Sequence, residues 1–488
     1  MKKGFDNDKY VQMQSEHIRE RIAIFGDKLY LEFGGKLYDD YHASRVLPGF
    51  APDSKLNMLM QLKDQAEIVI VINAGDIEKN KVRGDLDITY DRDVLRLKQL
   101  FTERGLYVGS VVITQYTGQK AADLFRERLK AAGIPVYTHY VIENYPNNVP
   151  FVISEDGFGK NDYIETSRPL VVVTAPGPGS GKMATCLSQL YHENRRGIRA
   201  GYAKFETFPI WNLALSHPVN LAYEAATADL NDVNMIDPFH LEAYETTAVN
   251  YNRDVEIFPV LRSVFEAIYG ECPYKSPTDM GVNMVGFCIE DDEACRDAAR
   301  QEILRRYYQA IIKRAAGQDV ENEIYKIELL MRNTKITVED RSVVPAALSL
   351  AAERGMPVAA MELPDGTIVT GRTGELLGAC AALLLNAIKN LAGIEDSVHL
   401  VSPEAIQPIQ YLKTAYLGSR NPRLHSDEVL IALSASASSN STALLAMKQL
   451  RRLKGCMAHA SVQLSSADVK TFRKLGIDLT YEPVPEQK

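Results

Sequence analysis

The chain has 488 residues, of which 46% are hydrophobic and 24% are charged, and 55 Lys and Arg stand against 63 Asp and Glu. This composition is typical of a soluble globular protein and excludes the collagen-like, disordered and coiled-coil classes. A chain of this length is expected to hold about two to four domains. The formal net charge of -8 excludes the basic surface of a general nucleic-acid-binding protein.

The N-terminal segment, the apolar runs and the cysteines predict where the protein works. The first residues lack the apolar core of a secretory signal, and no run reaches the roughly 18 apolar residues of a membrane helix. No two cysteines have CxxC spacing, so free thiols are favoured over disulfides or zinc. We therefore expect a cytoplasmic protein with no membrane partner and no zinc. The six cysteines are Cys186, Cys272, Cys288, Cys295, Cys380 and Cys456.

The first part of the chain alternates predicted strands and helices. The segment LYLEFGGKLY (29–38) predicts a hairpin with Gly34-Gly35 as its two-residue turn. Apolar β-branched runs then predict strands, and apolar residues at helical spacing predict helices, an alternation typical of parallel βαβ units. The predicted strands are 66–74, 107–114, 134–142, 169–175 and 198–206, and the predicted helices are 91–105, 119–133 and 182–197.

Two further regions follow, which gives three predicted domains: 1–219, 220–335 and 336–488. The middle region is helical and includes a long amphipathic helix over 293–317. The last region is α/β again. Its predicted elements are a hairpin over 356–371, a helix over 374–393 and strands over 427–436 and 456–464. The predicted fold class is α/β, with a parallel sheet, a P-loop-like strand–loop–helix segment, a helical middle region and a C-terminal α/β domain.

The strongest motif is the glycine-rich loop in RPLVVVTAPGPGSGKMATCLSQL (168–190). A buried strand enters the loop and a helix leaves it. Glycines let successive backbone N–H groups turn towards one anion, and the helix N-terminus and a lysine add positive charge. The predicted phosphate-binding residues are Gly177, Gly179, Ser180, Gly181, Lys182 and Thr185, and Lys182 is also a candidate catalytic residue.

The loop departs from the P-loop consensus GxxxxGK[ST] at two places. Pro176 holds the first glycine position, and Met183 stands where a Ser or Thr would bind Mg²⁺. Thr185 lies about 200° further around the helix and is a poor substitute. Phosphate binding is therefore favoured over ordinary Mg²⁺-dependent nucleotide hydrolysis, although ATP or GTP with Mg²⁺ stays open. The structural alternative is a tight strand-to-helix turn whose glycines serve packing.

Polar residues also end the next predicted strand. Lys204, Glu206 and Thr207 fall at its carboxyl end, the edge of a parallel sheet where ligands bind. In order and spacing, the arrangement resembles the dethiobiotin-synthetase and MinD branch of P-loop proteins, whose second strand ends in polar residues that face the nucleotide. Lys204 and Glu206 are thus candidate catalytic residues. A surface ion pair is the alternative.

Two other polar clusters are candidates for binding a metal or a polar substrate. The first follows the strand at 66–74, and the second could supply Mg²⁺ with oxygen ligands through Asp229, Asp232 and Asp237. A solvated loop and an acidic helix with capping residues are the alternatives. The first cluster consists of Asp76, Glu78, Lys81, Arg83, Asp85 and Asp87, and Glu224 and His240 accompany the second.

The C-terminal region offers two weaker signals. Its hairpin and the following helix, with Cys380 and Ala382, resemble the opening of cytidine-deaminase-type folds, but Ala382 holds the place of the catalytic Glu and no CxxC follows. The resemblance therefore implies a fold without zinc chemistry. The run Ser438, Ser439, Asn440 and Ser441 could cap a helix or bind an anion at its start.

The chain as a whole resembles a bacterial family of uncharacterised proteins known only as a domain of unknown function. The likeness is carried by 83–97, 167–193, 201–213 and 220–244 and implies a cytosolic α/β protein without an assigned reaction. The leading hypothesis is a nucleotide- or phosphate-dependent enzyme of small-molecule metabolism. The alternatives are a non-catalytic sensor or scaffold that binds a phosphorylated metabolite, and a purely structural oligomer. The expected partners are a phosphate-bearing small molecule and further copies of the chain.

Overall fold

The computed structural model describes residues 3–35, 37–38, 40–84, 86–230 and 232–485. The chain divides into two compact units, Lys2–Ala299 and Arg300–Lys488. The division falls inside helix α13 (Asp292–Ala315). Each unit has its own sheet.

The N-terminal unit is built on a seven-stranded sheet in the order β11-β8-β1-β7-β2-β5-β6. Every neighbouring pair is parallel. The central strands β1, β7 and β8 are buried along their whole length, as expected for a parallel sheet covered on both faces. The strands are β1 (Lys28–Phe33), β2 (Ala66–Asn73), β5 (Tyr107–Tyr116), β6 (Val136–Tyr140), β7 (Leu170–Thr174), β8 (Ala200–Phe205) and β11 (Gly281–Val282).

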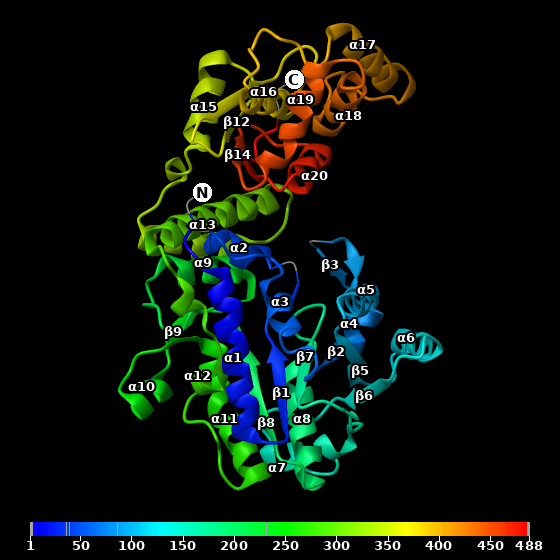
Figure 1. The fold of residues 1–488 in the computed structure, drawn as a ribbon, viewed down its shortest axis with the longest axis vertical. Coiled ribbons are helices and arrows are strands. Elements are labelled where there is room, and N and C mark those ends of the chain that lie inside the picture. Colours follow the sequence, from blue (N-terminus) through cyan, green and yellow to red (C-terminus); the bar gives the residue numbers. More distant parts are fainter. Residues whose placement is uncertain (1–2, 36, 39, 85, 231, 486–488) are drawn as a thin grey trace. The chain divides into compact units, whose positions relative to one another are not determined.

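Helices cover both faces of this sheet (Figure 1). Connections that run in opposite directions along a parallel sheet place their helices on opposite faces, because the crossovers are right-handed. Helices α1 and α3 pack together on one face, and α8 and α11 pack together on the other. The helices that connect or flank the strands are α1 (Asn7–Phe25), α2 (Tyr41–Val46), α3 (Ser54–Met60), α4 (Ala74–Glu78), α5 (Tyr90–Glu103), α6 (Lys120–Ala131), α7 (Val149–Val152), α8 (Lys182–Arg195) and α11 (Asn252–Tyr269).

The connections reverse direction between β1 and β7. From β1 the chain crosses β7 to reach β2, and from the neighbouring β7 it crosses β1 in the other direction to reach β8. Such a topological switch point opens a crevice at the carboxyl ends of the two strands, where α/β proteins bind ligands. The glycine loop follows β7 and therefore lies at this crevice.

Shorter elements complete the N-terminal unit, and two antiparallel pairs, β9–β10 and β3–β4, stand apart from the large sheet. They are β3 (Val82–Arg83), β4 (Ile88–Thr89), α9 (Pro218–Ala226), β9 (Asn234–Ile236), α10 (Pro238–Tyr244), β10 (Val249–Tyr251) and α12 (Pro277–Met280).

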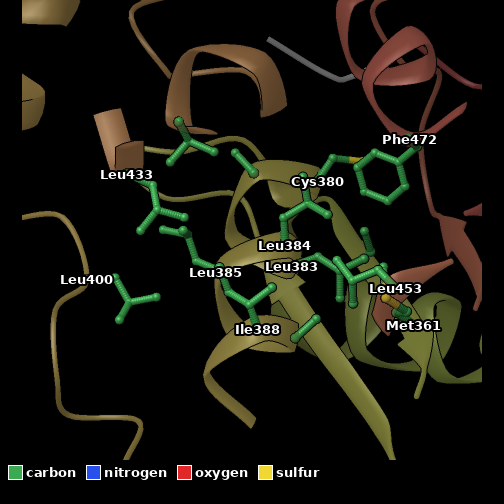
Figure 2. Packing of buried hydrophobic residues seen from close by; sticks show 14 of the residues in the cluster. Met361, Cys380, Leu383, Leu384, Leu385, Ile388, Leu400, Leu433, Leu453 and Phe472 are labelled. Atoms are coloured by element: carbon green, nitrogen blue, oxygen red, sulfur yellow. The ribbon is translucent and has the colours of Figure 1, made fainter. Parts of the chain in front are cut away.

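The C-terminal unit holds a mixed four-stranded sheet in the order β13-β12-β14-β15. The apolar helix α16 (Ala379–Ala392) packs against the β12–β13 hairpin. Figure 2 shows Leu383, Leu384 and Ile388 of α16 among the buried residues of the apolar cluster. The other elements are α14 (Glu321–Thr334), α15 (Val343–Arg354), β12 (Val358–Glu362), β13 (Ile368–Arg372), α17 (Pro403–Tyr411), α18 (Ser426–Ser436), α19 (Ser441–Met447), β14 (Met457–Ala460), α20 (Ser466–Lys474) and β15 (Asp478–Tyr481).

Most predicted elements are present within a few residues of their expected ends, and two predictions are wrong. The segment 29–38 is not a hairpin, because β1 pairs in parallel with β7 and β8 on either side; its Lys36 lies outside the described residues. The segment 427–436 is helix α18 rather than a strand. Its buried residues Val429, Ala432 and Leu433 have helical spacing, which a short apolar run does not distinguish from a strand.

Candidate functional site

The glycine loop takes the conformation that its glycines allow. Gly179 has φ +73° and Gly181 has φ +87°, a left-handed region that other residues adopt at a cost. At Gly177 a Cβ atom would overlap the hydroxyl of Tyr90, the first residue of α5. Any larger residue at these positions would therefore distort the loop.

Two neighbouring strand ends hold the loop through its carbonyl groups. Thr114 Oγ1 donates to Ser180 O at 2.6 Å, and Asn73 Nδ2 donates to Gly179 O at 3.3 Å. In a trans peptide, the C=O of one residue and the N–H of the next residue point in opposite directions. The N–H groups of Ser180 and Gly181 are thus directed away from β2 and β5.

Three kinds of donor at the start of α8 have no partner among the residues that the structure describes. No side chain caps the helix, although its first N–H groups have no acceptor within the helix. The Ser180 side chain is 2% exposed, and its hydroxyl has no hydrogen-bond partner. Half-buried Lys182, the first residue of α8, makes no hydrogen bond or ion pair with any residue that the structure describes.

Thr185 differs from the other predicted phosphate-binding residues. It is fully buried, and its hydroxyl donates to Gly181 O at 3.0 Å. This contact ties the first turn of α8 to the loop. The structure therefore gives Thr185 a supporting position.

The predicted pair Lys204 and Glu206 lies in a buried polar cluster at the carboxyl end of β8. Lys204 Nζ is 2.8 Å from Glu206 Oε1, donates to Tyr251 Oη at 2.9 Å, and also pairs with Asp254. The Tyr251 hydroxyl in turn donates to Glu206 Oε1. Since Lys204 is only 7% exposed, the alternative of a surface ion pair is excluded.

Burial and charge give the cluster unusual titration properties. Burial, with the Asp254 carboxylate, raises the pKa of Glu206 to about 7 against the opposing effect of Lys204. Burial disfavours the charge on Lys204, but the Asp254 and Glu206 carboxylates hold its pKa well above the ordinary value. Burial and the same two carboxylates raise the pKa of Tyr251. At neutral pH, Lys204 is charged, Tyr251 is a neutral donor and Glu206 is near its midpoint.

The strand register relates this cluster to the glycine loop. Glu32 of β1 lies level with Lys204 of β8 on one side and with Val173 of β7 on the other. Val173 and Lys204 are thus two strand spacings apart, about 10 Å. Residues at one level of a sheet point to the same face, as do alternate residues of one strand. Tyr30 therefore shares the face of Glu32, and its hydroxyl donates a hydrogen bond to Glu193 of α8. The Lys204 cluster therefore lies on the α8 face of the sheet.

The structure does not bring the three predicted metal ligands together. Asp229 is exposed, whereas Asp232 pairs with Arg253 at 2.6 Å. Asp237 caps α10 and accepts four hydrogen bonds, two of them from Thr278. Within the described ranges, no three His, Cys, Asp or Glu side chains are placed to hold a metal ion.

The residues near Asp229 and the polar cluster after β2 make local contacts instead. Glu224 accepts from Asn234 N, and His240 lies 3.1 Å from Ser276 Oγ. After β2, Asp87 is exposed and Asp85 lies outside the described residues. The remaining contacts are Asp76 with Lys81 at 3.3 Å, Glu78 with Ala121 N at 3.0 Å and Arg83 with Asp93 at 2.9 Å.

The C-terminal candidates are parts of the folded scaffold. Cys380 is 3% exposed and packs in the apolar cluster, and the residues around Ala382 belong to the same helix (Figure 2). All six cysteines are free thiols. Asn440 caps α19 by accepting from Thr442 N and Ala443 N, so the capping alternative applies to Asn440. The finer likeness to deaminases stays a prediction.

Sequence reasoning missed the residues that complete the site. Asn73, Thr114 and Tyr90 brace the loop, while Tyr251 and Asp254 enclose Lys204. The first two end predicted strands, and that position was an available signal. Tyr251 and Asp254 lie more than 40 residues after Lys204, and no spacing rule connects them.

The chain belongs to the family described as a domain of unknown function, DUF1846. The profile of its N-terminal domain matches residues 3–335, and that of its C-terminal domain matches residues 339–488. A relative from Streptococcus thermophilus strain CNRZ 1066, named UPF0371 protein str1377, is 59% identical over 482 residues, covering 99% of this chain and 98% of the relative. UPF0371 protein M28_Spy1076 of Streptococcus pyogenes serotype M28 is 58% identical over 481 residues, covering 99% and 97%.

The match confirms the family resemblance inferred from the motifs, and it assigns no activity. In the part of the chain that the structure describes, no helix has both the length and the apolar character needed to cross a membrane.

Proposed function

We propose that the protein is an enzyme of small-molecule metabolism that binds a phosphate- or pyrophosphate-bearing ligand at the glycine loop and acts on its phosphoryl group. The carrying observation is the set of unpartnered donors at one helix start: the buried Ser180 hydroxyl, the Lys182 ammonium and the N–H groups that open α8. Buried polar groups are nearly always partnered in folded proteins. A group of unpartnered donors therefore favours an anion.

The chemistry of the loop suits a phosphoryl group. A helix N-terminus carries partial positive charge, and its N–H groups hydrogen-bond phosphate oxygens. Lys182 adds a full charge beside them. The loop lies at the topological switch point, where the carboxyl ends of β1 and β7 meet.

In the proposed reaction, Lys182 neutralises charge that develops on the phosphoryl oxygens during transfer. The Lys204–Glu206 cluster, at the carboxyl end of β8, orients the substrate. ATP, GTP and phosphorylated metabolites all present the required group. Because the side chain of Met183 carries no oxygen ligand, the proposal requires no Mg²⁺ bound by that side chain.

Met183 also favours a second candidate, a sensor that binds a phosphorylated metabolite without converting it. Both candidates require the same anion site. They differ in turnover, since an enzyme releases product and a sensor only binds.

Thermal unfolding with added ligands tests the binding site. Wild type, Lys182→Ala and Lys120→Ala would be unfolded with phosphate, pyrophosphate, ATP or GTP at constant ionic strength, with and without Mg²⁺. Lys120 is the matched control, because it is the exposed first residue of α6 on the same sheet edge. A ligand at about 100 times its Kd adds roughly 2.7 kcal/mol of stability.

We expect at least one ligand to stabilise wild type and Lys120→Ala but not Lys182→Ala, without any requirement for Mg²⁺. Product formation from that ligand would then identify an enzyme, and binding alone a sensor. No stabilisation of wild type, or equal stabilisation of Lys182→Ala, would contradict the proposal.

A further inference from the structure

Glu206 is the member of the buried cluster that is most open to a ligand. About a fifth of its side chain is exposed (19%), against 9% for Lys204 and 7% for Asp254. Lys204 and Tyr251 both contact its Oε1 atom. Its Oε2 atom makes no hydrogen bond to the residues that the structure describes.

The end of β1 passes close beside the Glu206 side chain, at a position where only a glycine fits. A Cβ atom at Gly34 would lie 2.9 Å from Glu206 Cγ and 3.4 Å from Oε1. Strand β1 lies between β8, which leads to Glu206, and β7, which leads to the glycine loop.

The cluster holds more acids than bases. Glu206 and Asp254 share the single ammonium of Lys204, and Glu32 lies level with Lys204 on the neighbouring strand. One carboxyl group can therefore hold a proton at neutral pH. The titratable and charged groups that act on Glu206 are Lys204 on β8, Tyr251 on β10, Asp254 on α11 and Tyr223 on α9.

We propose that Glu206 is the proton acceptor of the site, taking through Oε2 the proton of the hydroxyl group that attacks the phosphoryl group held on the glycine loop. The attacking group is water or an alcohol. As its proton passes to Oε2, its oxygen forms the new bond to phosphorus. The bond from phosphorus to the leaving oxygen breaks, and the leaving group keeps the electron pair. This inference rests on the proposed function.

The other members of the cluster are positioning residues. Asp254 and Lys204 form an ion pair, and Tyr251 orients Glu206 by donating a hydrogen bond to its Oε1 atom. Burial places the pKa of Glu206 at about 7, which suits a group that must accept a proton near neutral pH and release it afterwards.

Proton linkage of anion binding tests this assignment without knowledge of the reaction. Sulfate is the probe, because it mimics a phosphoryl dianion and does not titrate near neutral pH. Proton transfer from an attacking hydroxyl requires the anion within about 6 Å of Glu206 Oε2. A dianion at that distance raises the pKa of Glu206 by roughly one unit, even in a water-like dielectric. At pH 7, binding should then take up roughly 0.3 to 0.4 of a proton per site. Calorimetric titrations in two buffers of different ionisation enthalpy measure this uptake.

Four variants separate the possible results. Glu206→Gln should bind sulfate without proton uptake, whereas Glu143→Gln, an exposed carboxylate after β6, should keep the uptake. Tyr251→Phe removes a hydrogen bond that lowers the pKa of Glu206, so its uptake should peak at higher pH. This second readout holds even if Glu206→Gln fails to fold. Lys182→Ala should bind no sulfate.

Sulfate binding to wild type without proton uptake, or uptake that persists in Glu206→Gln, would overturn the role of Glu206 and leave the anion site intact. No sulfate binding to wild type would overturn the proposed function and this inference together.

Discussion

The start of α8 and the start of α20 contrast two ways of treating the donors at a helix N-terminus. In α20, Ser465 caps the helix, and Asp468 accepts from Ser426 N and the hydroxyls of Ser426 and Ser465, with His425 Nδ1 at 3.0 Å. In α8, no side chain caps the helix, and within the described part of the chain neither the Ser180 hydroxyl nor Lys182 has a hydrogen-bond partner. The donors in the C-terminal unit stabilise the fold, and those of the glycine loop remain available to a ligand.

The largest effect on stability is expected from removing Asp468, which accepts the hydrogen bonds at the start of α20. Asp468→Ala removes the acceptor of four hydrogen-bond donors, of which the two from Ser426 are buried. We expect a loss of about 3 kcal/mol in the free energy of unfolding of the C-terminal unit, measured by urea denaturation. The control Ser438→Ala removes an exposed hydroxyl and should change stability by less than about 0.5 kcal/mol. A loss below about 1 kcal/mol for Asp468→Ala would contradict the contrast.

The two regions should also differ in the sign of their pH dependence. Burial raises the pKa of Glu206 from 4.5 to about 7, so the native state keeps a proton that the unfolded chain has lost. Stability is therefore lost as the pH rises from about 4.5 to 7. As the pH rises across this window, the free energy of unfolding of Glu206→Gln should increase by roughly 2 to 3 kcal/mol relative to that of wild type. A difference in unfolding free energy between the two proteins that stays constant with pH would contradict the raised pKa of Glu206.

Asp468 should behave in the opposite way. Burial alone would raise its pKa, but the hydrogen bonds from His425, Ser426 and Ser465 lower it from 3.8 to about 2. Its contribution is present above about pH 4 and disappears as the pH falls to 2, an expected loss of roughly 2 kcal/mol. Acid titration of wild type against Asp468→Asn, followed by circular dichroism, measures it. The same acid loss in both proteins would show that other groups cause it.

Single-hydroxyl and single-amide changes give the smallest expected effects. Asn440→Ala removes the cap of α19 and should lower stability by about 1 kcal/mol. Ser180→Ala removes a hydroxyl that has no protein partner, so stability should change by less than about 0.5 kcal/mol. Its affinity for the anion should fall about 5- to 10-fold, the value of one hydrogen bond. Denaturation and calorimetric binding of the same proteins measure both quantities.

The residues that the sequence revealed are those whose role follows from local spacing. The βαβ alternation predicted the parallel strands β2, β5 and β7, and the glycine spacing located the loop between β7 and α8. Lys204 and Glu206 were found because they end a predicted strand. Each of these signals depends on neighbours in the chain.

The parts that the sequence did not reveal depend on distant contacts. Lys204 contacts Tyr251 and Asp254, and both of these partners come from other elements of the fold. The segment 29–38 suggested a hairpin because Gly34-Gly35 suits a tight turn, but burial between β7 and β8 favours a parallel central strand. Asp229, Asp232 and Asp237 have the residue type of metal ligands, but their partners become clear only in three dimensions.

The most direct test of the account is the position of a bound anion in a crystal of the full chain soaked with tungstate, whose anomalous signal locates it. The account predicts tungstate at the start of α8, within hydrogen-bonding distance of Ser180 Oγ and Lys182 Nζ and of the N–H groups that open the helix. Tungstate bound only elsewhere, or a glycine loop in which Ser180 and Lys182 bond to protein atoms, would contradict it.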